Sequence, residues 1–242
     1  MQTFSFIVLA LALIPAAILM VLMLIRDKQQ PEPPPWLLRG VFYGVLSAFA
    51  SMLISVPLIT LGIVPSSYSD VFGAILHSFG AAAIPEETAK LAFLWLLLRR
   101  NPYFDEHLDG IVYAVCIGLG FAAIENVEYL FASGEQWLAT GIVRGLLAVP
   151  AHFFFAVLMG YYYSLVHFGH NPRRNALLVW AVPVLAHGIY DAIAMTQSVS
   201  AGLEALFGIA LLLFCNELRK LGQRHIRELA DVDSNHYDKH EA

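Results

Sequence analysis

The chain has 242 residues, of which 58% are hydrophobic and 14% charged, and its formal net charge is −5 at pH 7. A soluble domain carries about 25% charged residues, so this composition excludes an ordinary soluble globular enzyme. The acidic balance and the lack of a basic stripe exclude a nucleic-acid-binding protein. The apolar residues occur in runs of about twenty, the length that a helix needs to cross a bilayer. We therefore predict a membrane protein.

Seven segments are long and apolar enough to span a hydrocarbon core of about 30 Å at 1.5 Å per residue. In chain order they cover residues 4–25, 40–64, 71–98, 110–131, 137–166, 176–195 and 201–217. The first has no basic residue before it and is longer than the apolar core of a signal peptide, so we interpret it as a retained helix. The sequence thus predicts an all-α polytopic membrane helix bundle with about seven transmembrane helices.

The Lys and Arg residues predict how this bundle is oriented. Twelve of the fourteen lie on one side of the seven-helix arrangement, and the other two, Lys90 and Arg144, lie within predicted spans. Because cytoplasmic loops are enriched in Lys and Arg, we expect the N-terminus outside and the C-terminus in the cytoplasm, in the cell (inner or cytoplasmic) membrane. The predicted units are a first transmembrane helix (1–28), a Pro-rich cytoplasmic linker (29–36), a transmembrane bundle (37–218) and a cytoplasmic polar tail (219–242).

Seven of the ionisable side chains within the apolar segments draw attention. They are Glu86, Glu87, Lys90, Glu125, His152, His187 and Asp191. An ionisable group at mid-membrane costs roughly 2.5–3.5 kcal/mol. The four carboxylates alone then cost on the order of 10 kcal/mol, comparable with the stability of a typical domain. These groups must therefore be paired, neutralised, hydrated or bound to a ligand.

Four of these groups lie at a similar depth. Counted from the end of each segment on the Lys/Arg-rich side, Glu87 is 12 residues deep, Glu125 is 16, His152 is 15 and His187 is 13. At 1.5 Å per residue, these depths are about 18–24 Å. Consecutive spans run in opposite directions, so two acids and two imidazoles lie at one level in the outer half of the membrane. This coincidence predicts a single site.

Spacing within two helices indicates how the charges pair. Glu86 and Glu87 lie four and three residues before Lys90, so Lys90 can neutralise one carboxylate while the other faces a cavity. His187 and Asp191 are four residues apart, which lets the carboxylate orient the imidazole. A purely structural Glu–Lys pair would account for one of the two glutamates only.

Prolines lie close to three of the polar positions. Pro85, Pro150 and Pro183 each remove a backbone donor and loosen the helix locally. Freed carbonyl groups are tolerated in membranes where they line a water-filled cavity, so we expect water at this level. Arg144 lies near the outer end of its span, and we predict that it extends toward the membrane surface rather than into the site.

Four motifs carry a family resemblance. They are PEETAK (85–90), DGIVYAVCIGLGFAAIENVEYL (109–130), PAHFFFA (150–156) and AHGIYDA (186–192). In this order they closely resemble the PrsW family of intramembrane proteases, and they are more distantly similar to the CAAX prenyl protease and bacteriocin-processing superfamily. The resemblance covers about residues 69–195, which it implies to be the catalytic core of the bundle.

The resemblance implies a role for each matching residue. Glu86 and Glu87 match the double-Glu helix with Lys90 as its basic partner, Phe121 and Glu125 match an F-x-x-x-E motif, and His152 and His187 match the two following helices. We take these polar residues, together with Asp191, as the candidate catalytic residues.

Two chemistries fit this set. In a metal-free glutamic mechanism, Glu86 or Glu87 deprotonates a water that attacks the peptide carbonyl, and His152 and His187 stabilise the oxyanion or protonate the leaving amine. In a metal mechanism, Glu125, His152 and His187 hold Zn²⁺ with an open fourth position, and a glutamate of the pair is the base. The sequence leaves both open.

The resemblance implies an intramembrane endopeptidase that performs site-1 cleavage of membrane-anchored regulatory proteins such as anti-sigma factors. Its expected partners are a single-pass membrane protein substrate and the lipid bilayer. Buried Glu and His residues also relay protons in membranes, so the alternative is a proton-coupled transporter or channel. A third interpretation is a seven-helix receptor or scaffold whose polar cluster holds the bundle together.

Overall fold

The fold is given by a computed structural model, which describes residues 2–27 and 30–241. All regular structure in these ranges is helical, which confirms the predicted all-α class. The α-helices are α1 (Gln2–Arg26), α2 (Pro34–Thr60), α3 (Val71–His77), α4 (Ile84–Leu98), α5 (His107–Ala132), α6 (Trp137–Val143), α7 (Val149–His167), α8 (Pro172–Thr196) and α9 (Glu204–Glu241). Lys28 and Gln29, which flank the predicted boundary between the first helix and the linker, lie outside the described residues, as do Met1 and Ala242.

Two pairs of these helices are continuous rods joined by π-helical turns. The turn η1 (Ser78–Ala83) links α3 to α4, and η3 (Arg144–Ala148) links α6 to α7. Each π turn ends two residues before a proline, Pro85 or Pro150, whose missing N–H leaves carbonyl groups of the preceding turn without their usual donor. The loosening expected near these two prolines is thus seen directly before Glu86 and His152. If each joined pair is counted as one rod and each remaining helix as another, the described residues contain all seven predicted helices.

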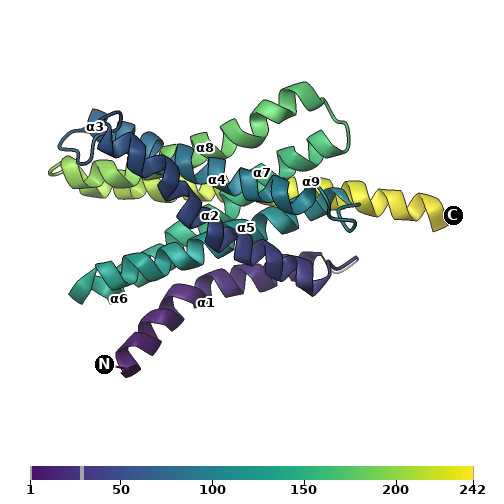
Figure 1. Cartoon of the computed structure of the whole chain (residues 1–242), viewed down its shortest axis with the longest axis horizontal. Helices are drawn as coiled ribbons and strands as arrows, with labels where there is room; N and C mark the ends of the chain where they lie inside the picture. The colour runs from purple at the N-terminus through teal and green to yellow at the C-terminus, as the bar shows by residue number, and fades with distance from the viewer. Residues whose placement is uncertain (1, 28–29, 242) are drawn as a thin grey trace.

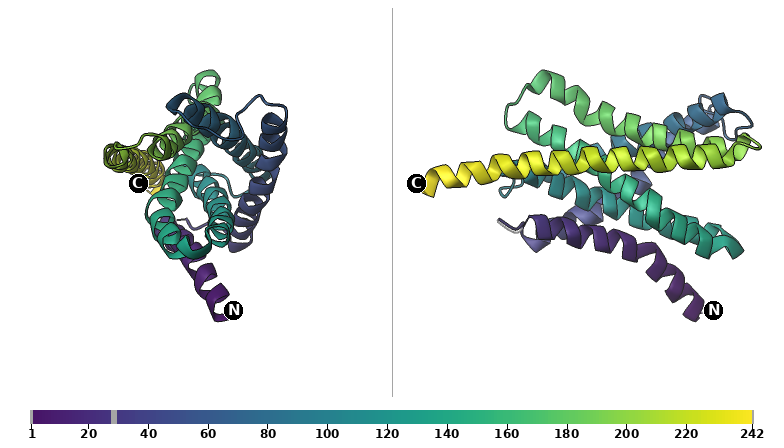
Figure 2. Two further views of the ribbon diagram at one scale, coloured as in Figure 1. Left: turned by 90° about the vertical axis from the view of Figure 1, so that its left-hand side faces the viewer. Right: turned by 180° about the vertical axis from the view of Figure 1, so that it is seen from behind.

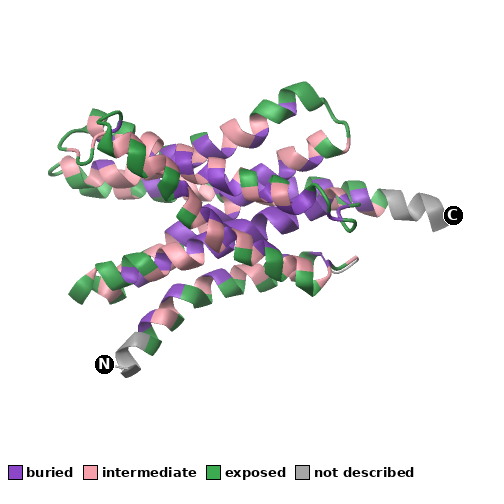
Figure 3. Ribbon diagram, viewed as in Figure 1, coloured by how far each residue is buried: buried purple, intermediate pink, exposed green. Residues whose placement is uncertain are grey.

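The rods lie roughly along one direction, and neighbours in the chain are mostly antiparallel (Figure 1). Helix α5 occupies the centre and contacts α1, α2 and α7. Buried residues concentrate along it, whereas the surrounding helices show more exposed and intermediate residues (Figure 3). Glycines permit the close crossings: a Cβ on Gly44 would overlap the carbonyl of Ile117, and one on Gly160 would overlap the carbonyl of Gly110.

The outer surfaces are apolar, as a lipid-facing bundle requires. Large side chains such as Leu53 and Phe6 are 79% and 70% exposed. Five rods meet the length and hydropathy expected of membrane spans: 6–26, 34–60, 107–132, 134–167 and 172–199. The rod 71–98 has charged residues in its middle, and α9 carries charges along its length, which lowers their hydropathy. The chain is a multi-pass membrane protein.

The predicted polar tail is an extension of α9. This helix contacts α5, α7 and α8 (Figure 2). Within the tail, Ile226 and Leu229 are buried, and Asp233 accepts hydrogen bonds from the backbone N–H groups of His107 (3.0 Å) and Leu108 (2.9 Å). The side chain of Asp233 thereby caps the first turn of α5, so the tail is attached to the bundle.

Candidate active site

All seven predicted site residues meet at one place in the bundle. Their side chains come from four helices and are connected by contacts of 2.8–3.9 Å. Helix α4 supplies Glu86, Glu87 and Lys90, α5 supplies Glu125, α7 supplies His152, and α8 supplies His187 and Asp191. Segments more than 100 residues apart in the chain therefore contribute to a single polar cluster.

Lys90 occupies the middle of this cluster. Its Nζ lies 2.8 Å from Oε1 of Glu87, 3.4 Å from Oε2 of Glu86 and 3.2 Å from Nδ1 of His152. The ammonium also lies 3.8 Å from the centre of the Phe121 ring, a cation–π contact. Lys90 is 3% exposed and Glu87 is fully buried, whereas Glu86 is 13% exposed. Lys90 therefore pairs most closely with Glu87, and Glu86 keeps access to solvent.

His187 is held between carboxylates. Its Nδ1 lies 2.8 Å from Oε1 of Glu87, and its Nε2 lies 3.2 Å from Oδ2 of Asp191 and 3.9 Å from Oε2 of Glu86. The ring stacks on Phe155 with centroids 4.8 Å apart and an interplanar angle of 15°. Both ring nitrogens face carboxylate oxygens, so the ring can donate a hydrogen bond from either nitrogen. Asp191 orients this ring, as the four-residue spacing predicts.

His152 is oriented by a second carboxylate. Its Nε2 lies 2.9 Å from Oε2 of Glu125, while its Nδ1 faces Lys90. Because the Lys90 ammonium can only donate, Nδ1 is an acceptor and the ring proton lies on Nε2, where it is donated to Glu125. This arrangement leaves Nδ1 facing the double-Glu helix.

The predicted position of Arg144 is wrong. Instead of extending to the membrane surface, its guanidinium donates to Oε2 of Glu125 (2.7 Å) and to Oδ1 of Asn126 (2.7 Å). Burial of the Glu125 carboxylate makes an inward partner favourable, and Arg144 is the first residue of η3, whose wide turn changes the direction of the side chains that follow. Sequence reasoning therefore missed this contact, although an Arg within an apolar run is itself a signal.

We expect Arg144→Leu to destabilise the protein by about 2–3 kcal/mol. The value is below the 3–5 kcal/mol of a fully buried broken pair, because Arg144 and Glu125 are 14% and 16% exposed. Adding Glu125→Gln should restore part of the loss, since it removes the unpaired charge. Thermal unfolding of the purified variants measures the loss of stability. If Arg144→Leu is as stable as wild type, the Arg144 side chain extends to the membrane surface, as the sequence predicted.

A cavity of about 190 Å³ adjoins the cluster. Its lining includes Glu86, Glu125, Ser51 and Tyr129, and its walls belong mainly to α2 and α5. A water molecule occupies about 30 Å³, so the cavity can hold several waters in contact with two carboxylates. The cavity therefore offers space for water next to the carboxylates of Glu86 and Glu125.

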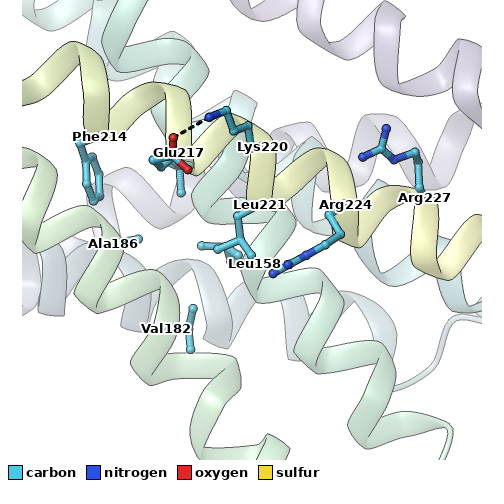
Figure 4. A pocket seen from close by; sticks show the side chains of 10 residues that line it. Leu158, Val182, Ala186, Phe214, Glu217, Lys220, Leu221, Arg224 and Arg227 are labelled. Carbon is cyan, nitrogen blue, oxygen red and sulfur yellow. Dashed lines mark hydrogen bonds and ion pairs between the residues drawn. The ribbon is translucent and has the colours of Figure 1, made fainter.

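A larger cavity of about 670 Å³ lies between α7, α8 and α9 (Figure 4). Apolar side chains, including Val182 and Phe214, line one part of it, and Arg224 and Arg227 line another. None of the seven predicted site residues lines this cavity. The chemistry therefore belongs to the smaller cavity.

The cluster has the donors of a metal site. Ligand atoms of Glu86, Glu87, His152 and His187 all lie within 4.8 Å of one another. Within the described part of the chain, the buried Oε2 of Glu87 has no hydrogen-bond partner, so it is available to bind an ion. Two imidazoles with carboxylates form a donor set that zinc prefers. Glu125, which the sequence suggested as a ligand, lies outside this group, and its Oε2 contacts His152 and Arg144 instead.

A bundle apolar enough to span a membrane, with a buried cluster of carboxylates and imidazoles beside a cavity, defines the class of intramembrane enzymes. The family model described as PrsW family intramembrane metalloprotease matches residues 32–215. The chain belongs to this family, and the resemblance of the four motifs is confirmed. Membership identifies an enzyme, which favours a protease over the transporter and scaffold alternatives.

Curated relatives agree with this assignment. The chain is 35% identical to Protease PrsW of Geobacillus kaustophilus over 202 residues, which cover 82% of this chain and 84% of that protein. It is 37% identical to Protease PrsW of Clostridioides difficile over 193 residues (77% and 79%) and 32% identical to Protease PrsW of Bacillus subtilis over 195 residues (80% and 85%). No solved structure matches the chain significantly.

Proposed function

We propose that this protease cleaves single-pass, membrane-anchored regulatory proteins, as in site-1 cleavage of an anti-sigma factor, in the cytoplasmic membrane. The observation that carries the proposal is the 190 Å³ cavity with Glu86 and Glu125 in its wall. Phe49 and Met52 of α2 also line it and are 54% and 41% exposed. Lipid-exposed side chains at the rim give a substrate helix a route from the bilayer to the carboxylates.

Glu86 is the proposed general base. It accepts a proton from a water in the cavity, and the water oxygen adds to the carbonyl carbon of the scissile peptide. His187, whose Nε2 lies 3.9 Å from Glu86, is placed to donate a hydrogen bond to the resulting oxyanion. The C–N bond then breaks, and the leaving nitrogen takes the proton from Glu86. Glu87 is buried between Lys90 and His187 and fixes their positions.

We propose Glu87, His152 and His187 as the ligands of the family's metal ion, with Zn²⁺ as the ion that this donor set favours. A bound zinc ion supplies Lewis-acid chemistry, which polarises the carbonyl and lowers the pKa of water. Lys90 Nζ contacts Glu87 and His152, so an ion at these atoms competes with the ammonium. In the metal mechanism, Zn²⁺ would lie next to Glu87 and His152. In the metal-free mechanism, the Lys90 ammonium occupies that position.

The position of the cut tests the substrate proposal. The purified protein is reconstituted with candidate single-pass proteins, and the products are mapped by mass spectrometry. We expect one cut in the outer half of the membrane, because the site lies about 18–24 Å from the Lys/Arg-rich ends of its helices. The exposed Glu135→Gln variant, just beyond the end of α5, is the control and should cut normally.

Two outcomes would contradict this proposal. A cut next to the Lys/Arg-rich ends would contradict the depth argument and the expected orientation. If the wild type leaves every candidate intact but conducts ions or solutes in liposomes, and Glu86→Gln abolishes that flux, the transporter interpretation is correct.

A further inference from the structure

A second group of buried carboxylates lies at the opposite end of α5 from Glu125. Asp27 directly follows α1, Glu32 precedes α2, Glu106 is the N-cap of α5, and Asp109 lies in the first turn of α5. Asp109 lies 16 residues before Glu125 on the same helix, which is about 24 Å along the axis. These four residues, the acidic end cluster, are therefore separate from the active site.

The members of this cluster are almost completely removed from solvent. Asp109 is fully buried, and Asp27, Glu32 and Glu106 are 4%, 6% and 8% exposed. Oδ2 of Asp109 accepts hydrogen bonds from the backbone N–H groups of Asp105 (3.1 Å) and Glu106 (2.7 Å). Glu32 accepts a hydrogen bond from the hydroxyl of Tyr113. These contacts fix the carboxylates in place.

Among the residues that the structure describes (2–27 and 30–241), no hydrogen-bond partner is found for two buried oxygens of the cluster. They are Oδ2 of Asp27 and Oδ1 of Asp109. One oxygen from each of Asp27, Glu106 and Asp109 lies within 4.8 Å of the other two. An unpaired buried carboxylate oxygen is costly, so two such atoms on different segments of one cluster indicate a missing positive partner.

The charge balance among the described residues supports a cation rather than a simple hydrogen-bonded network. The carboxylates of Asp109 and Glu32 take their hydrogen bonds from backbone N–H groups and from the Tyr113 hydroxyl, and none of these donors carries a charge. The cluster therefore gains stability from any positive group that enters it.

We propose that Asp27, Glu106 and Asp109 form a binding site for a hard divalent cation of the Ca²⁺ and Mg²⁺ class. Such ions prefer carboxylate oxygens, and the three donors include no imidazole or thiolate. Carboxylate oxygens bind Ca²⁺ at about 2.3–2.6 Å, so three oxygens that lie within 4.8 Å of one another are close enough to share one ion. The ion ties the end of α1 to the start of α5.

Cation binding is measured on the full-length protein in detergent by equilibrium dialysis with radioactive Ca²⁺, and by thermal unfolding with Ca²⁺, Mg²⁺ or neither. We expect one Ca²⁺ per chain and a higher melting temperature when it is bound. Asp27→Asn and Asp109→Asn should each weaken binding about tenfold or more, because affinity follows the number of charged ligands. Asp109 also caps the first turn of α5, so Asp109→Asn is expected to destabilise the fold as well. Asp27→Asn lacks this effect and is therefore the main test of binding.

Two control variants test whether the acidic end cluster itself holds the ion. Asp105→Asn removes an exposed carboxylate at the same end of the bundle and should leave affinity unchanged. His187→Ala removes an imidazole of the active site and should also bind Ca²⁺ normally. The proposal is overturned if no stoichiometric Ca²⁺ or Mg²⁺ binds at up to about 10 mM. It is equally overturned if Asp27→Asn binds like wild type, or if Asp105→Asn loses as much affinity, which would indicate surface charge.

Discussion

Glu86→Gln is expected to slow peptide cleavage by about 10²–10⁴-fold, the usual contribution of a general base. The substitution keeps the size of the side chain and removes its ability to accept a proton. Lys90 remains 2.8 Å from Glu87, so the rest of the cluster keeps its main ion pair. The melting temperature should therefore stay close to that of the wild type while the rate of substrate cleavage collapses.

Glu87→Gln provides the matched comparison, because it makes the same chemical change one residue away. Glu87 is fully buried and contacts both Lys90 and His187. Its loss leaves the buried Lys90 ammonium with a weaker partner, so stability and activity should fall together. If Glu87→Gln instead unfolds like wild type and is inactive while Glu86→Gln still cuts, the two roles are reversed.

The helices were predictable because a bilayer imposes a length on each apolar run. The predicted segment 71–98 coincides with the rod formed by α3, η1 and α4. The start of α2 was predicted at residue 40 but lies at Pro34, because proline is favourable in the first turn of a helix. The packing of Ile226 and Leu229 was missed because a polar, amphipathic tail gives no signal of what covers its apolar face.

The composition of the site was predictable for a similar reason. Ionisable groups are expensive in a membrane, so few occur, and their depth along alternating helices places them at one level. Depth does not specify rotation about each helix axis. The inward direction of Arg144 and the contact between Lys90 and His152 depend on that rotation and on the π turns η1 and η3. Hydrophobic periodicity does not reveal such turns.

Those contacts also decide which residues can hold a metal. Glu125 was a reasonable ligand on composition, since zinc peptidases use two histidines and a glutamate. In the structure its Oε2 contacts Arg144 and His152. That position is typical of a carboxylate that orients a ligating histidine from behind. We propose that Glu87, whose buried Oε2 has no hydrogen-bond partner among the described residues, is the ligand instead.

The purified protein is therefore expected to contain about one zinc ion per chain, the stoichiometry of a three-ligand catalytic site. A His152→Ala/His187→Ala double variant should contain none, because it loses two of three ligands, and it should be inactive. Elemental analysis by mass spectrometry measures the metal independently of activity. His170→Ala, which removes an exposed imidazole in a loop, should keep the full amount.

Glu125→Gln distinguishes the two possible ligand sets. If Glu125 only orients His152, the variant should retain zinc with an affinity about 10–100-fold weaker. Complete loss of zinc in Glu125→Gln, with zinc retained in Glu87→Gln, would instead make Glu125 the ligand. A metal-free preparation that cuts its substrate and resists chelators would assign the positive charge next to Glu87 and His152 to Lys90, because its ammonium already lies within hydrogen-bond distance of both.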